Sequence, residues 1–294
     1  MNYVNHDKVA KRATFRLILN NVFKVVSLIA TLFGIVMLAI LLIRIFNQGI
    51  SFINWNFLTG RLSTFPERAG ILGAVLGSLW LIAVVVPVMM IVGIGTAVYI
   101  ELYMKDGKFK SLISLNIKNL SGVPSIVYGI LGLAIFVRAL NLGSVVLAGG
   151  LTISLLVLPI TIVATQEAIR AVPNDLSDGA LGIGATKWQS IKTIILPAAL
   201  PSIITGAILA LSRAIGETAP LVVLGIPTLL LPFPGSLFDK FTVLPMQIYY
   251  WTLDSVLVAE YANLAAATII VLLTVLFILN FIAVTIRRKF EINF

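Results

Sequence analysis

The sequence is dominated by apolar stretches long enough to cross a lipid bilayer, and this feature restricts the fold more than any other. Val22–Phe46 and Tyr261–Ile286, for example, each exceed the roughly 20 apolar residues that span the hydrocarbon core. Inside lipid every backbone N–H and C=O must be paired within the chain, so such segments form helices. We therefore predict an all-α polytopic membrane protein. Its six expected transmembrane helices are Val22–Phe46, Gly70–Tyr103, Ser121–Leu140, Val145–Thr165, the segment from just after Pro201 to Leu224, and Tyr261–Ile286.

The composition excludes several kinds of protein chemistry. Of the 294 residues 59% are hydrophobic and 11% are charged, which is outside the range of water-soluble domains. The absence of cysteine excludes disulfides and thiolate metal sites. The single histidine, His6, lies in the N-terminal segment, which excludes a histidine-based relay or catalytic triad.

Basic residues are distributed unevenly between the two sides of the membrane that six spans define. They gather at both ends of the chain, after the second span and between the fourth and fifth spans. The group after the second span, Lys105, Lys108, Lys110 and Lys118, is assigned to a cytoplasmic loop. By the positive-inside rule both termini are cytoplasmic, which accounts for the net charge of +9 without nucleic-acid binding.

These assignments predict the organisation of the chain. It has an N-terminal cytoplasmic tail (1–21), a first transmembrane helix (22–46), a transmembrane core (70–286) with a cytoplasmic loop (170–200), and a C-terminal cytoplasmic tail (287–294).

Two charged residues lie inside the fifth span, where a charge at the bilayer centre costs about 2.5–3.5 kcal/mol. Arg213 and Glu217 are one helical turn apart, so one reading is that they neutralise each other. The other is that they face a path for an anion. A guanidinium suits tetrahedral oxyanions, and Glu217 can accept the proton that phosphate, unlike sulfate, retains near neutral pH.

Three further charged residues are candidates for the same path. Glu167 and Arg170, three residues apart at the cytoplasmic end of the fourth span, either line the inner mouth of the path or form an ordinary interfacial ion pair. Arg138, at the outer end of the third span, either guides anions inward or extends its guanidinium to the membrane surface.

The polar segment DGALGIGATKWQSIKTIILP, residues 178–197, separates two apolar spans. Together with the residues just before it, it carries two apolar stripes at helical spacing, made of Leu176, Ala180 and Ile183 and of Trp188, Ile191 and Ile195. Gly184 between them permits a sharp turn. Such a helix pair either docks in a groove on another protein or lies flat on the membrane. It is not a phosphate-binding loop, because Thr186 and not glycine precedes Lys187.

The spacing of this segment resembles the coupling loop of ATP-binding-cassette (ABC) importer permeases, whose pattern is E-A-A, three residues, G, nine residues and I-x-L-P. It departs where Asp178 replaces Glu and Gly179 replaces Ala, and the glycine lowers helix propensity. The resemblance implies a type I importer (MetI-like) permease fold with this loop docked on an ATPase. The residues expected in that contact are Asp178, Gly179, Ala180, Gly184, Lys187, Trp188, Ile194, Leu196 and Pro197.

Three other segments narrow the resemblance to one subfamily. SGVPSIVYGILGL (121–133), RAIGETAPL (213–221) and LPMQIYYW (244–251) are similar to phosphate-specific transport permeases of the PstA family. The resemblance implies ATP-driven import of inorganic phosphate across a bacterial cytoplasmic membrane, with Arg213, Glu217 and Thr218 in the path. It also implies a PstC-like sister permease, PstB-like ATPase subunits and a PstS-like phosphate-binding protein. ATP and magnesium then belong to the ATPase, and this chain is expected to bind no cofactor and to be no enzyme.

Two alternatives stay open. The same architecture can carry another oxyanion, such as sulfate or molybdate. A secondary transporter or channel gated by Arg213 and Glu217 would need no ATP. The missing inverted-repeat signal and the coupling-loop spacing count against this second alternative.

Overall fold

The computed structural model describes residues 6–227 and 233–289, with side chains from residue 16 onward. The outer parts of both expected tails, 1–5 and 290–294, lie outside the described residues. The described residues are helical, apart from loops and one isolated antiparallel bridge between Val145 and Lys240. With η marking short 3₁₀ or π segments, the elements are α1 (His6–Gly49), η1 (Ile50–Phe52), α2 (Trp55–Thr59), η2 (Pro66–Arg68), α3 (Leu72–Val88), η3 (Met89–Gly93), α4 (Ile94–Val98), η4 (Tyr99–Tyr103), α5 (Lys108–Leu120), α6 (Ser125–Gly132), η5 (Leu133–Ala139), α7 (Val146–Arg170), α8 (Asn174–Gly182), α9 (Lys187–Ser190), η6 (Ile191–Ile195), α10 (Leu196–Gly216), α11 (Ala219–Val223), α12 (Leu244–Asp254) and α13 (Glu260–Lys289).

The chain divides into two compact units, Met1–Gln48 and Gly49–Phe294. In the first unit α1 begins at His6, so most of the segment expected as a tail is helical. The helical stretch Arg16–Phe52 is long enough to cross a membrane, and its most apolar 18 residues have a mean hydropathy of 2.9. It contains the expected first span, 22–46.

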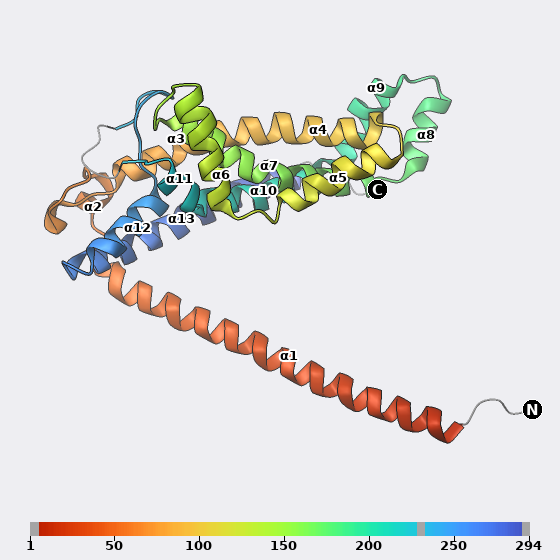
Figure 1. Cartoon of the computed structure of the whole chain (residues 1–294), viewed down its shortest axis with the longest axis horizontal. Helices are drawn as coiled ribbons and strands as arrows, with labels where there is room; N and C mark the ends of the chain where they lie inside the picture. The colour runs from red at the N-terminus through yellow and green to blue at the C-terminus, as the bar shows by residue number, and fades with distance from the viewer. Residues whose placement is uncertain (1–5, 228–232, 290–294) are drawn as a thin grey trace, which may run out of the picture. The chain divides into compact units, whose positions relative to one another are not determined.

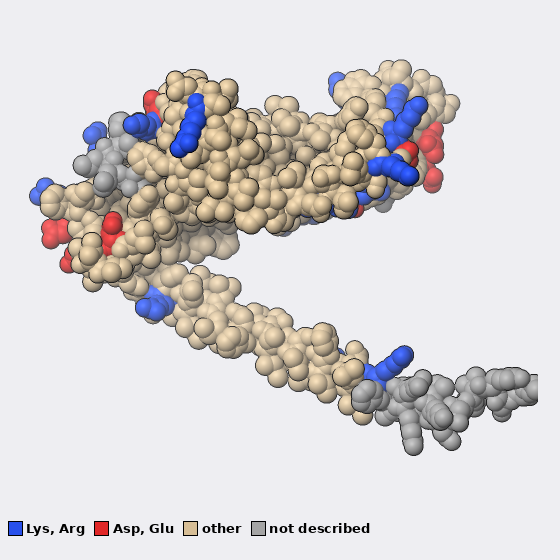
Figure 2. Space-filling view, in the orientation of Figure 1, with Lys and Arg blue, Asp and Glu red and all other residues tan. Residues whose placement is uncertain are grey.

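The second unit contains four more helices that are long and apolar enough to cross a membrane: Leu72–Tyr103, Val146–Arg170, Lys187–Gly216 and Glu260–Lys289. Lys108–Leu120 and Ser125–Ala139 meet at a bend of 100°, and together they are long and apolar enough for either a broken sixth span or a re-entrant loop. On the face of this unit shown in Figure 2, charged side chains gather toward the two ends. The predicted all-α membrane architecture is confirmed.

Two predicted boundaries are wrong. The residues after the second span are not simply a loop, because 108–120 form α5, which packs along α7. The fifth helix begins at Lys187 and not after Pro201, and it ends at Gly216 and not at Leu224. Its start is fixed by a capping box: the Thr186 N–H donates to Gln189 Oε1 (2.7 Å), and the Gln189 N–H donates to Thr186 Oγ1 (3.3 Å).

Helix α7 is the centre of the second unit. Its most apolar 18 residues are 67% buried, against 33% for Leu72–Tyr103 and for Lys187–Gly216. Helices α3, α6 and α10 pack around it (Figure 1), and Ile153 and Val157 are fully enclosed. The buried hydroxyls of Thr152 and Ser154 donate to the carbonyls four residues earlier, which satisfies them without water.

The start of α7 is closed by the segment that leads into α12. The first N–H groups of α7 lack partners within the helix, and here the Val146 and Leu147 N–H groups donate to the carbonyls of Asp239 and Leu237 at 3.1 and 2.9 Å. The Asp239 carboxylate is held in turn by hydrogen bonds from the Gly235 N–H and from Ser236, which lower its pKa.

Helix α6 approaches α11 closely at Gly129. A Cβ at Gly129 would lie 2.7 Å from Pro220 Cα and 3.0 Å from Pro220 O, so only glycine fits this contact. The neighbouring Tyr128 is buried, and its hydroxyl donates to Leu120 O at the end of α5 (2.9 Å). The segments 121–133 and 213–221, which carry the family resemblance, therefore lie against each other.

We predict that Gly129→Ala destabilises the protein by about 1–3 kcal/mol, because the added methyl group meets the rigid backbone of Pro220. Gly95→Ala is the matched control: a Cβ there has nothing within 4 Å, so alanine should stabilise the helix by about 0.5–1 kcal/mol. The measurement is thermal unfolding of the purified chain in detergent. Equal melting temperatures for the two variants would contradict the close approach.

Candidate functional site

The two charged residues predicted inside the fifth span lie where that helix ends. Gly216 is the last residue of α10, and Glu217 is extended, with φ −76° and ψ 126°. The Arg213 Nε donates to Glu217 Oε1 at 3.2 Å. The two residues do form the expected pair, but Glu217 stands at a helix break and not inside a helix, because the chain turns there into Thr218 and the buried Pro220.

Much of the Arg213 guanidinium is unused. Its side chain is 42% exposed and that of Glu217 17%. Among the described residues only Nε has an acceptor, which leaves Nη1 and Nη2 open to another ligand. A charge exposed along a membrane-spanning bundle requires water or a protein partner and not lipid. The geometry suits a group that binds something from outside this chain.

Two residues with hydroxyl groups lie near this helix break. Thr218 precedes α11, where its backbone carbonyl accepts from the Leu221 and Val222 N–H groups at 3.0 Å each. Its side chain makes no capping hydrogen bond. Tyr128 precedes Gly129, which closely approaches Pro220 at the start of α11. Both hydroxyl-bearing residues thus lie at or near the break between α10 and α11.

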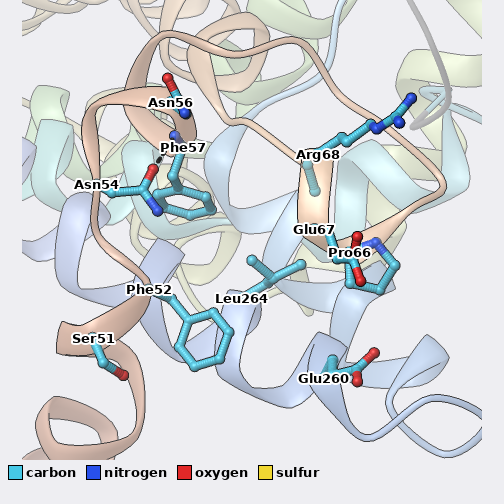
Figure 3. A pocket seen from close by; sticks show the side chains of 11 residues that line it. Ser51, Phe52, Asn54, Asn56, Phe57, Pro66, Glu67, Arg68, Glu260 and Leu264 are labelled. Atoms are coloured by element: carbon cyan, nitrogen blue, oxygen red, sulfur yellow. Dashed lines mark hydrogen bonds between the residues drawn. The ribbon is translucent and has the colours of Figure 1, made fainter.

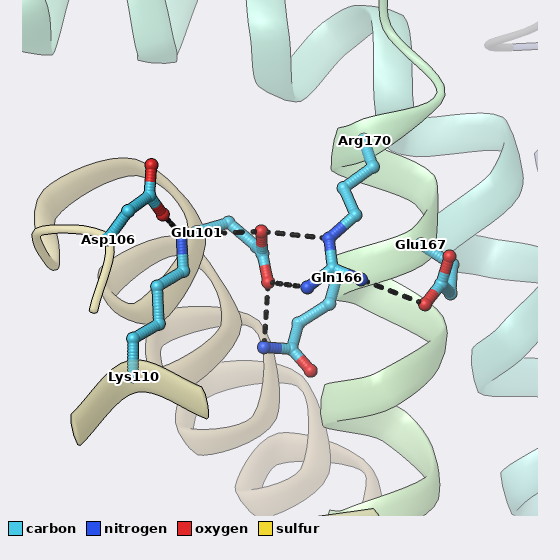
Figure 4. Close-up of polar contacts among 6 residues, drawn as sticks. All are labelled: Glu101, Asp106, Lys110, Gln166, Glu167 and Arg170. Carbon is cyan, nitrogen blue, oxygen red and sulfur yellow. Dashed lines mark hydrogen bonds and ion pairs between the residues drawn. The ribbon is translucent and has the colours of Figure 1, made fainter. Parts of the chain in front are cut away.

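A second cluster of charges joins η4, α5 and α7 (Figure 4). The Glu101 carboxylate is only 7% exposed and receives two hydrogen bonds from Arg170, from Nη2 at 2.6 Å and from Nε at 3.0 Å. Gln166 Nε2 donates to the same carboxylate at 2.9 Å. Lys110 Nζ lies 3.9 Å from it and 2.9 Å from Asp106.

The predicted Glu167 and Arg170 belong to this second cluster. Arg170 Nη1 donates to Glu167 Oε1 at 3.2 Å, as an interfacial ion pair would. Their central partner, Glu101, was not among the site residues predicted from the sequence. The available signal was a lone acidic residue at the end of an apolar span, which requires a cation when it is buried.

Arg138, the third minor candidate, lies exposed in the last turn of η5. It forms no ion pair with any described residue.

The predicted coupling segment forms two short helices joined at Gly184, whose φ of +89° requires glycine. The apolar stripes divide between the interior and the surface of the chain. Ala180, Ile191 and Ile195 are buried, but Ile183 is 89% exposed and Trp188 is 56% exposed. Ile183 and Trp188 therefore remain available for contact with another protein or with the membrane.

The other residues predicted for coupling are distributed along the same segment. Asp178 and Gly179 are exposed on α8, and Ile194, Leu196 and Pro197 are half-buried where η6 continues into α10. Lys187 Nζ lies 5.0 Å from the centre of the Tyr103 ring, a cation–π contact between α9 and η4. The exposed apolar tip is made of Leu181, Ile183 and Trp188.

A cavity of about 490 Å³ lies at the other end of the second unit, beside α2, η2 and the start of α13 (Figure 3). Glu67, Arg68 and Glu260 give it a charged rim, and Phe57 and Leu264 give it an apolar base. Asn54 shapes one wall by accepting the Phe57 N–H at 2.8 Å, which caps α2.

Comparison with known protein sequences assigns a family to the chain. Residues 89–292 match the family described as binding-protein-dependent transport system inner membrane component. The probable ABC transporter permease protein YqgI of Bacillus subtilis (strain 168) is 34% identical over 206 residues, which cover 68% of this chain and 70% of that protein. The phosphate transport system permease protein PstA of Yersinia pestis is 28% identical over 285 residues, 95% of this chain and 93% of that protein. PstA of Mycobacterium leprae (strain TN) is 37% identical over 163 residues, 54% of this chain and 53% of that protein.

Solved structures of ABC importers share the fold. A bacterial alginate ABC transporter in complex with alginate pentasaccharide-bound periplasmic protein aligns with a TM-score of 0.63 at 16% identity, over 95% of this chain and 96% of that chain. The inward-facing MetNI methionine ABC transporter aligns with a TM-score of 0.57 at 16% identity, over 79% of this chain and 100% of that chain. The chain therefore belongs to the binding-protein-dependent transport system inner membrane components, as a membrane-spanning permease subunit of an ABC importer that is similar to PstA.

Proposed function

We propose that this chain forms part of the path by which an ATP-driven importer carries inorganic phosphate across the membrane. The observation that carries the proposal is Arg213 at the break between α10 and α11, with two guanidinium nitrogens unused among the described residues and Glu217 beside it. The names of the PstA relatives support phosphate as the cargo.

The pair offers a physical basis for selecting a protonated oxyanion. The Nη1 and Nη2 groups of Arg213 can donate to two oxygens of one tetrahedral anion. Glu217, 3.2 Å from Nε, repels a fully deprotonated anion but accepts a hydrogen bond from the P–OH of phosphate. The same carboxylate weakens the grip of Arg213, so the anion can leave. Thr218 supplies a hydroxyl next to the pair.

Partner chains complete this importer. In our proposal the end of the bundle that carries α8 and α9 is cytoplasmic, as are both termini. A PstB-like ATPase contacts the apolar tip made of Leu181, Ile183 and Trp188. A PstC-like sister permease covers the exposed side of Arg213, and a PstS-like protein delivers phosphate at the opposite end. ATP and magnesium bind to the ATPase, and this chain supplies translocation without catalysis.

Uptake of labelled phosphate by vesicles that hold the assembled complex tests the proposal. ATP-dependent uptake that excess sulfate or molybdate leaves unchanged is the expected result. Uptake blocked by sulfate or molybdate would replace phosphate with another oxyanion as the cargo. Uptake without ATP would contradict coupling to an ATPase.

Arg213→Ala should lower the Vmax/KM of phosphate uptake by about 10- to 100-fold, the equivalent of the roughly 1.5–3 kcal/mol that a charged hydrogen-bond contact contributes. Arg288→Ala, which removes an exposed guanidinium from the last turn of α13, is the control and should transport normally. Unchanged uptake by Arg213→Ala would remove this residue from the path.

Glu217→Gln should relax the discrimination against sulfate. A carboxylate can only accept hydrogen bonds and so repels an unprotonated oxygen, whereas the amide nitrogen can donate to one. We therefore expect sulfate to inhibit phosphate uptake at about tenfold lower concentration than in the wild type, a change of about 1.4 kcal/mol. The measurement is the inhibition constant of sulfate. An inhibition constant that stays the same in the variant would show that Glu217 does not select the anion.

Trp188→Ala should weaken binding of the ATPase subunits by about 30-fold, because a large exposed aromatic at the centre of an interface typically contributes about 2 kcal/mol or more. The equilibrium binding of purified ATPase to the permease complex measures this. Phe277→Ala removes an even more exposed aromatic from α13, 68% against 56% for Trp188, and should leave the affinity unchanged. Equal affinities in both variants would place the ATPase contact elsewhere.

A further inference from the structure

One side of α5 lines a cavity that the sequence analysis did not anticipate. Lys110, Ser111, Ser114 and Lys118 recur at three- and four-residue spacing, which places them on one face of the helix. Glu101 and Arg170 form part of the opposite wall. The cavity has a volume of about 600 Å³, which corresponds to roughly twenty water molecules at about 30 Å³ each. It is large enough for a hydrated anion.

The charges of this cavity are paired at one end and unpaired at the other. Lys110 forms an ion pair with Asp106, and Arg170 forms ion pairs with Glu101 and Glu167. Lys118 is exposed and has no ion pair with any residue that the structure describes. Because the acidic groups lie near the start of α5, the end of the cavity beside Lys118 is positive.

Helix α5 runs from the Glu101 cluster to the start of α6. It starts beside the Glu101 cluster and runs from the α8–α9 end of the bundle back toward α6 (Figure 1). Lys118 lies ten residues after Lys108, about 15 Å further along the helix axis. Two residues later, Leu120 O accepts the hydrogen bond of Tyr128, whose neighbour Gly129 closely approaches Pro220 at the start of α11. Lys118 thus lies near the end of α5 that leads to the contact between α6 and α11, away from the Glu101 cluster.

Lysine at this position has the chemistry of a transient binding site. An unpaired charge within a membrane-spanning bundle persists only beside water or a partner. The ammonium group is compact, strongly hydrated and mobile, so it attracts an anion without the two-point grip of arginine. The neighbouring hydroxyls of Ser111 and Ser114 can donate to the same anion.

We propose that Lys118 is a pathway residue, which receives phosphate released from Arg213 and passes it along the α5 cavity toward the α8–α9 end. This inference rests on the proposed phosphate transport and adds the second half of the route. It also gives a transport role to Lys118, which the sequence pattern assigned to a cytoplasmic loop.

The first test compares transport by three variants of the assembled complex. Lys118→Gln should raise the KM for phosphate by about tenfold, the effect of losing one charged contact, and Lys118→Arg should restore most of the loss. Lys108→Gln removes an exposed lysine that does not line the cavity and should transport normally. If the wild type imports phosphate and Lys118→Gln has a normal KM, this inference fails and the proposed function stands. If the wild type imports no phosphate, the proposed function fails.

The second test uses the absence of cysteine from the chain. The single cysteine of Lys118→Cys should react with a charged, membrane-impermeant thiol reagent applied from the α8–α9 side, and saturating inorganic phosphate should slow this reaction. Phe277→Cys, on an exposed apolar face of α13, should not react, because it faces lipid. This test does not depend on the transport rate of the variant.

Two results of the labelling would overturn the proposal. If the cysteine at position 118 does not react with the reagent, no aqueous path reaches this position. Protection that depends on anionic phospholipid in the vesicles, and that inorganic phosphate does not reproduce in neutral-lipid vesicles, would make the cavity a lipid-headgroup site.

Discussion

Lipid offers no hydrogen-bond partners, so the backbone groups freed where α10 breaks have to be satisfied inside the protein. The chain achieves this locally. The Glu217 N–H reaches Ala214 O at 3.4 Å, and Thr218 O accepts from the first turn of α11. Pro220 has no N–H to satisfy, and Leu224 O accepts the Ser144 hydroxyl at 2.8 Å. The contact of α6 at Gly129 then covers the break from one side. Every feature of the Arg213 site depends on this supported interruption of a helix.

The two charged clusters of the second unit differ in how completely they are satisfied. Glu101 is nearly enclosed and engages Arg170 through two hydrogen bonds, a geometry that fixes η4 against α7. Arg213 is held through a single nitrogen. Its side chain is 42% exposed and that of Arg170 44%, so the two arginines differ in the number of their hydrogen bonds and not in exposure. A fully bonded ion pair serves structure, because breaking it leaves a buried charge without a partner. A partly bonded guanidinium retains capacity for a ligand that arrives and leaves.

The sequence predicted those parts of the fold that depend on apolar length. Helix α13 and helix α7 lie close to their expected positions because uninterrupted apolar runs determine them. Helix α5 was missed because its lysines, serines and asparagines resemble a loop, and only packing along α7 makes it a helix. The start of the fifth helix was missed for the same reason, since Thr186 and Gln189 lie in a polar segment.

The sequence predicted some residues of the candidate site and not others. Arg213 and Glu217 were identifiable because charges within a span are costly. Glu101 and Lys118 were not, because their roles depend on which helices lie beside them, and a single sequence does not determine helix neighbours. The outward direction of Ile183 and Trp188 depends likewise on the turn at Gly184, which periodicity does not describe.

The helix from Lys187 to Gly216 runs without a loop, so a movement at one of its ends displaces the other end. Its 30 residues make a rod of roughly 45 Å, with Lys187 and Trp188 at one end and Arg213 at the other. A tilt of the rod by about 5° around its α9 end displaces the far end by roughly 4 Å, given that length. The distance over which a guanidinium holds or loses an anion is of the same size. The helix therefore joins the tip of the bundle to Arg213 without any loop, and the π segment η6 and Pro201 are the places where it can bend.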